Sequence, residues 1–430
     1  MAVFVARVVV PGPEAMRRMD RWLGVPLCAA LSGIRRAARV WRKTRAQDQA
    51  VRRVLFVQLA ESGSMVLADP AMRALTARSG AQAYCLTFAH NRDSLAIAGT
   101  VPPERVFVIR TGSLRVLAAD AWRFLRDVRR TRIDALVDLE LFSRLTAALC
   151  LLTGVGRRAG FHRFEGVGLY RGDLYTHPLA FNPQLHMAQN YLMLVEALFA
   201  EDVPPAPRVP AAMLVPRVRR RALGADELAG VRERLRCLPG GPVGDERLVF
   251  MNANASAMLP QRRWPQAHFA ALVRATLARY ADVRVLLIGA EDDGVTTAAI
   301  AAEVGDERCV DIAGRFALGE LPALFTLGAA LVSNDSGPAH FAAVTALPVI
   351  ALFGPETPVL FRPLGEATVI SAGLACSPCV NAGNQRRTRC TDNQCMQRIS
   401  VAVVFGALCG VLEVRPARMA PSDGLAGVGA

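Results

Sequence analysis

The stretch VSNDSGPAHFAAVTALPVIALFGPETP, residues 332–358, decides the fold of this chain. An apolar run ends on the polar residues Asn334, Asp335 and Ser336, and a Gly-Pro pair then opens a segment with the composition of a helix. A second apolar run follows and ends in Phe-Gly-Pro. Two buried strands joined by a helix are typical of a βαβ unit, so the stretch predicts a parallel sheet with helices on its faces.

Polar residues at the end of such a strand are candidates for ligand binding, because ligands of open α/β sheets sit outside the carboxyl ends of the strands. Pro338 suits a first helical turn, which needs no N–H there, and Gly337 lets a phosphate approach the backbone. The free N–H groups and the helix dipole would form an anion site. A plain Asp or Ser helix cap is the alternative. No P-loop or G-x-G-x-x-G occurs, which argues against a Walker ATPase and a common dinucleotide fold.

The same alternation of strands and helices runs through residues 51–205 and again through 246–415. A stretch rich in proline, glycine and charge, 206–245, separates them and is predicted to be a linker with one helical piece in it. A chain of 430 residues is too long for one ordinary core. We therefore predict two doubly wound α/β domains that face a central cleft, with a flexible tail over 416–430.

The composition excludes several classes of protein. Hydrophobic residues make up 52% and charged residues 20%, as in a folded protein. The formal net charge of +14 indicates anionic partners. Aromatic residues make up only 6%, and no zinc-finger, RNP or helix-turn-helix pattern occurs, so no nucleic-acid partner is expected.

Residues 1–50 are predicted to be a basic amphipathic extension. The apolar core of this segment, Trp22 to Ile34, lies between arginines and is shorter than the roughly 18–20 residues that span a bilayer. It has no clear signal-peptide cleavage pattern. The hypothesis is a helix on a membrane surface with Trp22 and Leu23 facing lipid. The alternative is a surface helix packed on the protein itself.

A second polar cluster follows another predicted strand, in NANASAMLPQRRWPQAHFAAL, residues 252–272. Its adjacent Arg262 and Arg263 precede a helix and would neutralise a diphosphate. Two solvated surface arginines are the alternative.

Seven segments of the chain also match, in order, the motifs of a known family: VLFVQLAESGSMVLADPAMRAL, GRRAGF, HMAQNYLMLVEAL, RRWPQAHFAAL, LLIGAEDD, DIAGRFALGELPAL and NDSGPAHFAAVTALPVIALFGP. The chain resembles the family-nine glycosyltransferases, whose best-known members are the ADP-heptose:lipopolysaccharide heptosyltransferases. The resemblance implies a GT-B fold and an inverting, metal-independent transfer of sugar from a nucleotide-sugar. It also implies a donor site in the C-terminal domain and an acceptor site in the N-terminal one.

The resemblance implies roles for individual donor-site residues. Arg262 matches the family's diphosphate-binding basic residue, and Asp293 matches the acidic residue that reaches the nucleoside. The expected donor set is Asn254, Arg262, Arg263, Asp293, Asp335, Ser336, Gly337 and His340. ADP-heptose is the favoured donor.

The first catalytic turn departs from the family pattern. The family carries Gly-Asp after its first strand, and that Asp is the expected base, whereas this chain has Gly63-Ser64. Ser64 cannot accept the acceptor proton unaided at neutral pH. Glu61 in the same turn can, so we predict Glu61 as the general base. The alternative is that Glu61 caps the turn and the base is another residue, or absent. The altered turn also leaves room for a donor other than ADP-heptose.

The segment RRAGFHRFEGVGLYRG, residues 157–172, is rich in basic residues. Arg158, His162 and Arg163, with Arg171 nearby, are predicted to bind an anionic glycolipid acceptor. A merely solubilising surface is the alternative. His186 also matches a family position, and a buried capping histidine is its simpler explanation.

A cysteine-rich loop over residues 376–395 has the spacing C-x2-C-x10-C-x4-C, formed by Cys376, Cys379, Cys390 and Cys395. Four thiolates are the ligand set of a closed structural zinc site. Free or redox-active thiols and two disulfides are the alternatives. No cofactor is expected for catalysis.

The sequence therefore predicts an inverting GT-B glycosyltransferase, cytoplasmic and peripheral on the inner membrane, that builds lipopolysaccharide or another cell-surface glycan. Two other functions remain open: a nucleotide-sugar-binding protein that has lost catalysis, and a nucleotide-sugar epimerase.

Overall fold

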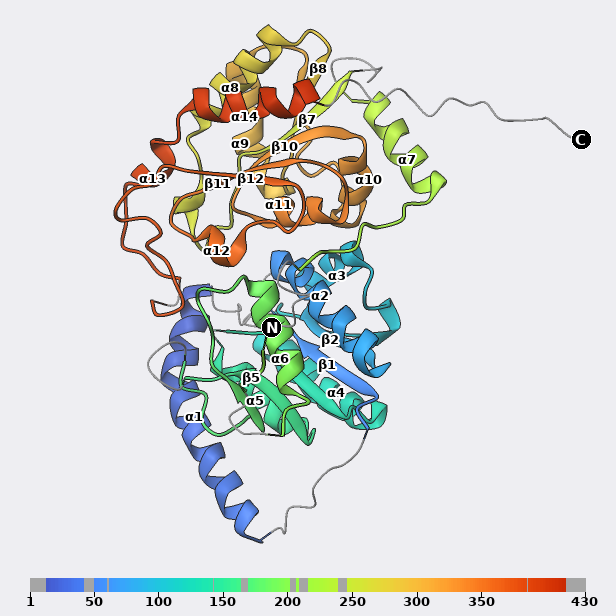
Figure 1. Cartoon of the computed structure of the whole chain (residues 1–430), viewed down its shortest axis with the longest axis vertical. Coiled ribbons are helices and arrows are strands. Elements are labelled where there is room, and N and C mark those ends of the chain that lie inside the picture. The colour runs from blue at the N-terminus through green and yellow to red at the C-terminus, as the bar shows by residue number, and fades with distance from the viewer. Residues whose placement is uncertain are drawn as a thin grey trace, which may run out of the picture.

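The computed structural model describes residues 13–41, 50–59, 62–141, 143–163, 169–201, 206–208, 216–238, 246–384 and 386–414. The chain forms two α/β lobes, an N-lobe drawn in blue to green and a C-lobe drawn in yellow to red (Figure 1). The predicted pair of doubly wound domains is confirmed.

The N-lobe sheet has six parallel strands in the order β3-β2-β1-β4-β5-β6. They are β1 (Arg53–Val57), β2 (Gln82–Phe88), β3 (Val106–Ile109), β4 (Ala135–Asp138), β5 (Arg157–Phe161) and β6 (His177–Leu179). The helices of this lobe are α1 (Pro13–Trp41), α2 (Ser62–Ser79), α3 (Arg92–Ala98), α4 (Leu114–Thr131), α5 (Arg144–Leu152) and α6 (Met187–Ala197). The central strand β1 is buried along its apolar residues because helices cover both faces of a parallel sheet.

The C-lobe repeats this order as β12-β11-β10-β7-β8-β9. Its strands are β7 (Arg247–Asn252), β8 (Val283–Leu287), β9 (Cys309–Asp311), β10 (Gly328–Asn334), β11 (Val349–Phe353) and β12 (Ala367–Ser371). Its helices are α7 (Ala225–Arg236), α8 (Gln266–Arg279), α9 (Gly294–Val304), α10 (Leu321–Thr326), α11 (Gly337–Phe341), α12 (Pro358–Phe361), α13 (Gln394–Gln397) and α14 (Val401–Val414).

Each strand order reverses once, between β1 and β4 in the N-lobe and between β7 and β10 in the C-lobe. Crevices at such switch points are where doubly wound sheets bind ligands. The segment 332–358 contains the end of β10, then α11 and β11, as predicted. Its polar residues therefore lie at the C-lobe switch point.

The predicted linker contains a helix, α7, where one helical piece was expected. Within it, α7 buries Val231 and Leu235 in the apolar core. That core is continuous between the lobes, since Met65 of α2 and Phe341 of α11 belong to the same buried cluster. The predicted tail over 416–430 lies outside the described residues. Within the described part of the chain, no helix is both long enough and apolar enough to cross a bilayer.

Candidate active site

The C-lobe switch point holds a connected set of buried polar side chains. Asn252 at the end of β7 donates its amide N–H to Oγ of Ser336 at 2.6 Å and to Oγ of Ser333 at 3.0 Å. Asn334 at the end of β10 accepts from the backbone N–H of Trp264 at 3.0 Å and donates to the carbonyl of Ala253 at 2.8 Å. These bonds hold the loop after β7 against the end of β10.

The loop after β7 brings Arg262 to Asp335. Nη1 of Arg262 lies 3.4 Å from Oδ2 of Asp335, and both side chains are largely buried. Nε of Arg262 has no hydrogen-bond partner among the described residues. A buried guanidinium with an unused donor is equipped to bind an anion. We call the set Asn252, Arg262, Asn334, Asp335, Ser336 and Gly337 the donor platform.

Arg263 points elsewhere. Its guanidinium donates twice to the carbonyl of Ala255, at 2.9 and 3.2 Å, and its side chain is exposed. The two adjacent arginines therefore do not act as a pair in this structure, and only Arg262 reaches Asp335.

Asn254 and Asp293 meet beside the platform. A Cβ built on Gly289 would lie 2.7 Å from Cβ of Asp293 and 2.9 Å from Nδ2 of Asn254, so Gly289 is what allows the approach. Nδ2 of Asn254 has no partner within the described ranges. Oδ2 of Asp293 accepts from the backbone N–H of Ala290 at 2.9 Å, so Asp293 also caps its own turn.

His340 connects the platform with the N-lobe. It lies on α11, which begins at Gly337 and has only five residues, so its dipole is short. A Cβ built on Gly63 of α2 would lie 2.8 Å from Cδ2 of His340. The first turn of α2 in the N-lobe is therefore in direct contact with the beginning of α11 in the C-lobe, through Gly63 and His340.

The structure adds a buried carboxyl that the sequence analysis missed. Glu356 follows β11, is 1% exposed, and its Oε2 accepts from Nε of Arg386 at 2.7 Å. Burial raises the pKa of Glu356, with a further upward contribution from Asp335, while Arg386 and Arg262 lower it. The signal was available, because Glu356 stands at the exit of a predicted strand as Asp335 does.

Arg386 belongs to the cysteine-rich loop, which is fastened to the donor platform. The backbone N–H groups of Cys379 and Val380 donate to the carbonyl of Pro355 at 3.0 and 2.9 Å. The side chain of Asn393 donates to the carbonyl of Arg263 at 2.9 Å. The loop therefore covers the ends of β11 and of the arginine segment.

The four cysteines of this loop are free thiols in the structure. They lie near one another, since burial together with the other three thiols raises the pKa of Cys395 to about 11. Oriented as they are, however, no group of three or more His, Cys, Asp or Glu in the described part of the chain is placed to hold a metal ion. The structural zinc site therefore stays a prediction.

The N-lobe switch point carries a second carboxyl that the sequence analysis missed. Oε1 of Glu140, just after β4, accepts from the backbone N–H of Leu59 at 2.6 Å. Asp138 is fully buried, accepts from the hydroxyl of Tyr175 at 2.5 Å and lies 3.5 Å from Nη1 of Arg171. Applying the strand-exit rule to this strand would have found Glu140.

Ser64 is buried in the first turn of α2, beside Gly63. Glu61, the predicted base, lies outside the described residues, between Leu59 and the start of α2. Its role stays a prediction.

The residues predicted to bind the acceptor differ in burial, and not all of them face solvent. Arg158 is buried in β5 and donates to the carbonyls of Leu174 and Val155, so it holds the sheet edge and does not form an exposed basic face. Arg171 is fully buried, which corrects its assignment to that face. His162 is half-buried, and burial lowers its pKa. Arg163 is exposed and remains the best placed of these for an anionic acceptor.

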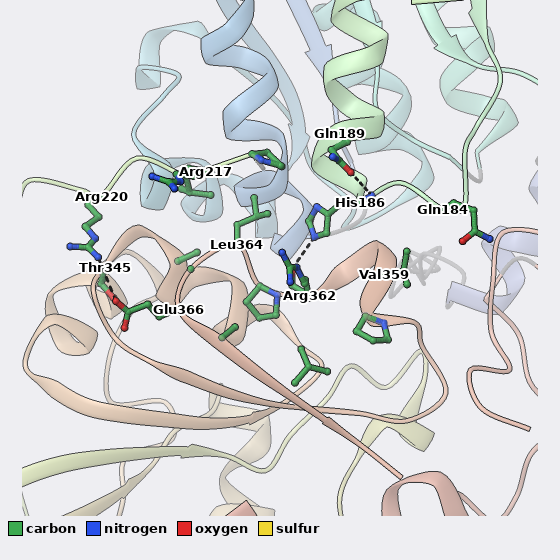
Figure 2. A pocket seen from close by; sticks show the side chains of 18 residues that line it. Gln184, His186, Gln189, Arg217, Arg220, Thr345, Val359, Arg362, Leu364 and Glu366 are labelled. Carbon is green, nitrogen blue, oxygen red and sulfur yellow. Dashed lines mark hydrogen bonds and ion pairs between the residues drawn. The ribbon is translucent and has the colours of Figure 1, made fainter. Parts of the chain in front are cut away.

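A cavity of about 1000 Å³ lies between the lobes, on the side of the linker (Figure 2). His186 lines it, accepts at Nδ1 from the backbone N–H of Ala188 at 3.2 Å, and donates from Nε2 to the carbonyl of Arg362 at 2.9 Å. The simpler explanation of His186, a buried cap, is confirmed. Burial lowers its pKa to about 4, so it links the lobes as a neutral imidazole.

Comparisons with known proteins agree with this architecture. A family model described as glycosyltransferase family 9 (heptosyltransferase) matches residues 121–388. Lipooligosaccharide heptosyltransferase 2 of Haemophilus influenzae is 37% identical over 116 residues, 26% of this chain and 33% of that protein. The match thus spans about a third of that relative's length.

Two solved structures share the fold. The E. coli ADP-heptose lps heptosyltransferase II aligns with a TM-score of 0.65 at 21% identity, over 84% of this chain and 98% of that one. A family 9 glycosyltransferase from Veillonella parvula aligns with a TM-score of 0.67 at 17% identity, over 85% and 99%. The predicted GT-B fold is confirmed by these likenesses.

Proposed function

The chain belongs to glycosyltransferase family 9, and from that membership we propose that it transfers a sugar from a nucleotide-diphosphate donor to a lipopolysaccharide-core or other cell-surface glycan acceptor. The observation that carries the proposal is the donor platform: a buried arginine with an unused N–H at the switch point of a doubly wound sheet. ADP-heptose is the donor we favour, because the E. coli and Haemophilus relatives are named as heptosyltransferases.

In this proposal the donor diphosphate binds at Arg262 and at the backbone N–H groups that begin α11. Asp335 keeps Arg262 oriented before the donor arrives, at 3.4 Å. As the bond to the sugar breaks, negative charge grows on the departing diphosphate. A preorganised guanidinium stabilises that charge best in a buried site, where water does not screen it.

Glu61 would accept the proton of the acceptor hydroxyl as that oxygen attacks the anomeric carbon from the face opposite the diphosphate, which inverts the configuration. No metal ion takes part in this proposal. The beginning of α2, which follows Glu61 in the sequence, contacts His340 of the C-lobe. Glu140 is the rival base, because it is a described carboxyl at the N-lobe switch point and its neighbour Asp138 is fully buried.

The proposed setting is the cytoplasmic face of the inner membrane, with the protein bound peripherally. An anionic glycolipid acceptor would meet the exposed Arg163, and the net charge of +14 would favour an anionic surface.

The first test is donor binding, measured as thermal stabilisation of the wild type and of Arg262→Ala by a panel of nucleotides and nucleotide-sugars. We expect ADP or ADP-heptose to stabilise the wild type, and Arg262→Ala to lose most of that shift. Arg263→Ala is the matched control and should keep it, because Arg263 bonds to the carbonyl of Ala255. Stabilisation only by UDP, GDP or dTDP compounds would retire the heptose donor, and no stabilisation at all would contradict the proposal.

Transfer to a delipidated core acceptor then separates the two carboxyls. Glu61→Gln should lose transfer while retaining donor binding, and Glu140→Gln should retain a measurable rate. The reverse pattern would assign the base to Glu140. Unchanged transfer in both variants would exclude Glu61 and Glu140 as the base, and a free isomer of the donor formed without acceptor would indicate an epimerase.

A further inference from the structure

The helix α1 packs on the N-lobe with its polar side. Four residues of α1 at four-residue spacing are buried: Asp20, Gly24, Cys28 and Ser32. The carboxylate of Asp20 accepts from the backbone N–H groups of Arg144 and Leu145 at 2.7 and 3.0 Å, and so caps the beginning of α5. Polar and small residues therefore make much of this contact, beside a small apolar cluster in which Cys28 and Leu31 pack against the N-lobe.

The helix α1 and the N-lobe approach each other closely at two glycines, one on each side of the contact. A Cβ on Gly24 would lie 2.7 Å from Cβ of Arg144. Ser32 accepts from the backbone N–H of Asp173 at 2.8 Å. Gly172 has a φ of +59°, and a Cβ there would lie 2.2 Å from Oγ of Ser32. This fit fixes which side of α1 faces outward.

The outward side is apolar. Five of its large side chains are substantially exposed: Trp22 at 76%, Leu23 at 57%, Val25 and Leu27 at 38%, and Ile34 at 66%. At about 100° per residue, Trp22, Leu23, Ile34, Ala29 and Ala30 lie in the half of the helix that faces away from the buried row, and Leu27 lies at the border of that half. A continuous exposed apolar stripe of this kind marks a surface that docks on something.

The charged residues of α1 indicate which kind of partner covers the apolar stripe. Arg18, Arg21 and Arg36 of α1 are exposed, with Arg18 and Arg36 bordering the stripe and Arg36 also paired with Asp173, and the described side chains of α1 expose no carboxylate. Tryptophan beside arginines and an uncharged aliphatic stripe is the pattern of a helix that lies in the boundary between water and an anionic bilayer. Figure 1 shows α1 along one side of the N-lobe, with one end close to the C-lobe in this view and the other end extending away from it.

We propose that the outward stripe of α1 inserts into an anionic lipid surface while its polar side stays docked on α5, so that the N-lobe is held in a fixed orientation on the membrane. This inference deepens the proposed function, on which it rests only for the identity of the acceptor. It makes α1 a preformed membrane-binding face of the folded lobe, in contrast to a flexible tether.

The test is co-sedimentation of the full chain with vesicles of phosphatidylcholine, alone or mixed with phosphatidylglycerol. We expect binding to the mixed vesicles and little binding to the neutral ones. Trp22→Ser/Leu23→Ser/Ile34→Ser should lower the partition coefficient at least about tenfold, since each loses apolar burial. Arg18→Gln/Arg21→Gln should also lower it about tenfold. The matched control, Trp122→Ser/Leu114→Ser/Val295→Ser, removes equally exposed side chains elsewhere and should bind as the wild type does.

Equal loss in the control, or no vesicle binding by the wild type, would overturn the inference. So would a dimer, seen by analytical ultracentrifugation, that the α1 triple variant abolishes, because the stripe would then face a second copy. Thermal stabilisation by ADP should be the same in the triple variant and in the wild type. Vesicle binding without any nucleotide response would leave this inference intact and contradict the proposed function.

Discussion

At the scale of single residues, the charges of the donor platform and of the adjoining Glu356–Arg386 pair are balanced before any ligand binds. Arg262 faces Asp335, and Arg386 faces Glu356. Both carboxyls lie within a buried region, so each adds repulsion against an incoming diphosphate as well as orienting its arginine. Protonation of Glu356 would remove part of that repulsion, because its pKa is raised by burial.

We expect Glu356→Gln to bind ADP about fivefold more tightly than the wild type at neutral pH, because one negative charge leaves the pocket. In the wild type, donor affinity should rise as the pH falls through the raised pKa of Glu356, above its ordinary value of 4.5. The variant should lack this rise. Titration calorimetry at several pH values measures both effects.

Glu303→Gln is the control, since Glu303 pairs with Arg274 on the surface of the C-lobe. If Glu356→Gln weakens ADP binding, the carboxylate acts by holding Arg386 and not by repulsion.

At the scale of elements, the contact between α2 and α11 joins the two halves of the site. Two short segments far apart in the chain, the first turn of α2 and the middle of α11, approach so closely that one of them must lack a side chain. Gly63 supplies that space, and Ser64 beside it is buried. This packing explains why the turn carries glycine without invoking backbone strain.

Gly63→Ala should lower the free energy of unfolding by about 1–3 kcal/mol, because its Cβ would meet the ring of His340. Transfer activity should fall as well, since the lobes would be held apart. Chemical denaturation and a transfer assay measure the two effects.

Gly294→Ala on α9 is the matched control, because nothing lies within 4 Å of a Cβ there. Should Gly63→Ala be as stable and active as the wild type, the contact does not constrain the site.

At the scale of the whole molecule, the lobes are joined by apolar packing and by hydrogen bonds that cross between them. The bond from His186 to the carbonyl of Arg362 is one of these, at the edge of the cavity between the lobes (Figure 2). On the other side of that cavity, Arg220 and Glu366 approach to 4.0 Å, a pair exposed enough to contribute little.

The folded protein should lose stability as the pH falls from 6.5 toward 4. The unfolded chain protonates His186 near its ordinary pKa of 6.5, whereas the folded state resists protonation until about 4. The difference between the two pKa values corresponds to a loss of roughly 3 kcal/mol in the free energy of unfolding. This loss is complete below the pKa of the folded state and absent above that of the unfolded chain. Urea denaturation at pH 7 and pH 4.5 measures it.

His186→Gln should show a smaller loss over the same interval, because the remaining histidines account for what is left. A pH dependence unchanged by this substitution would assign the acid sensitivity to other groups.

The sequence by itself determined the two doubly wound lobes, because alternating buried strands and helices require a parallel sheet covered on both faces. It also placed Asn334, Asp335 and Ser336 at the exit of a buried strand, because strand ends, glycine and proline are recognised from the local sequence. The tertiary structure alone decided that Arg262 reaches Asp335 and Arg263 does not, that Arg158 and Arg171 are buried, and that Glu356 and Glu140 stand at the site. It also decided which side of α1 faces outward. The physical reason is that burial and pairing depend on which distant segments pack together, and the local pattern of a charged residue is the same whether it is solvated or enclosed.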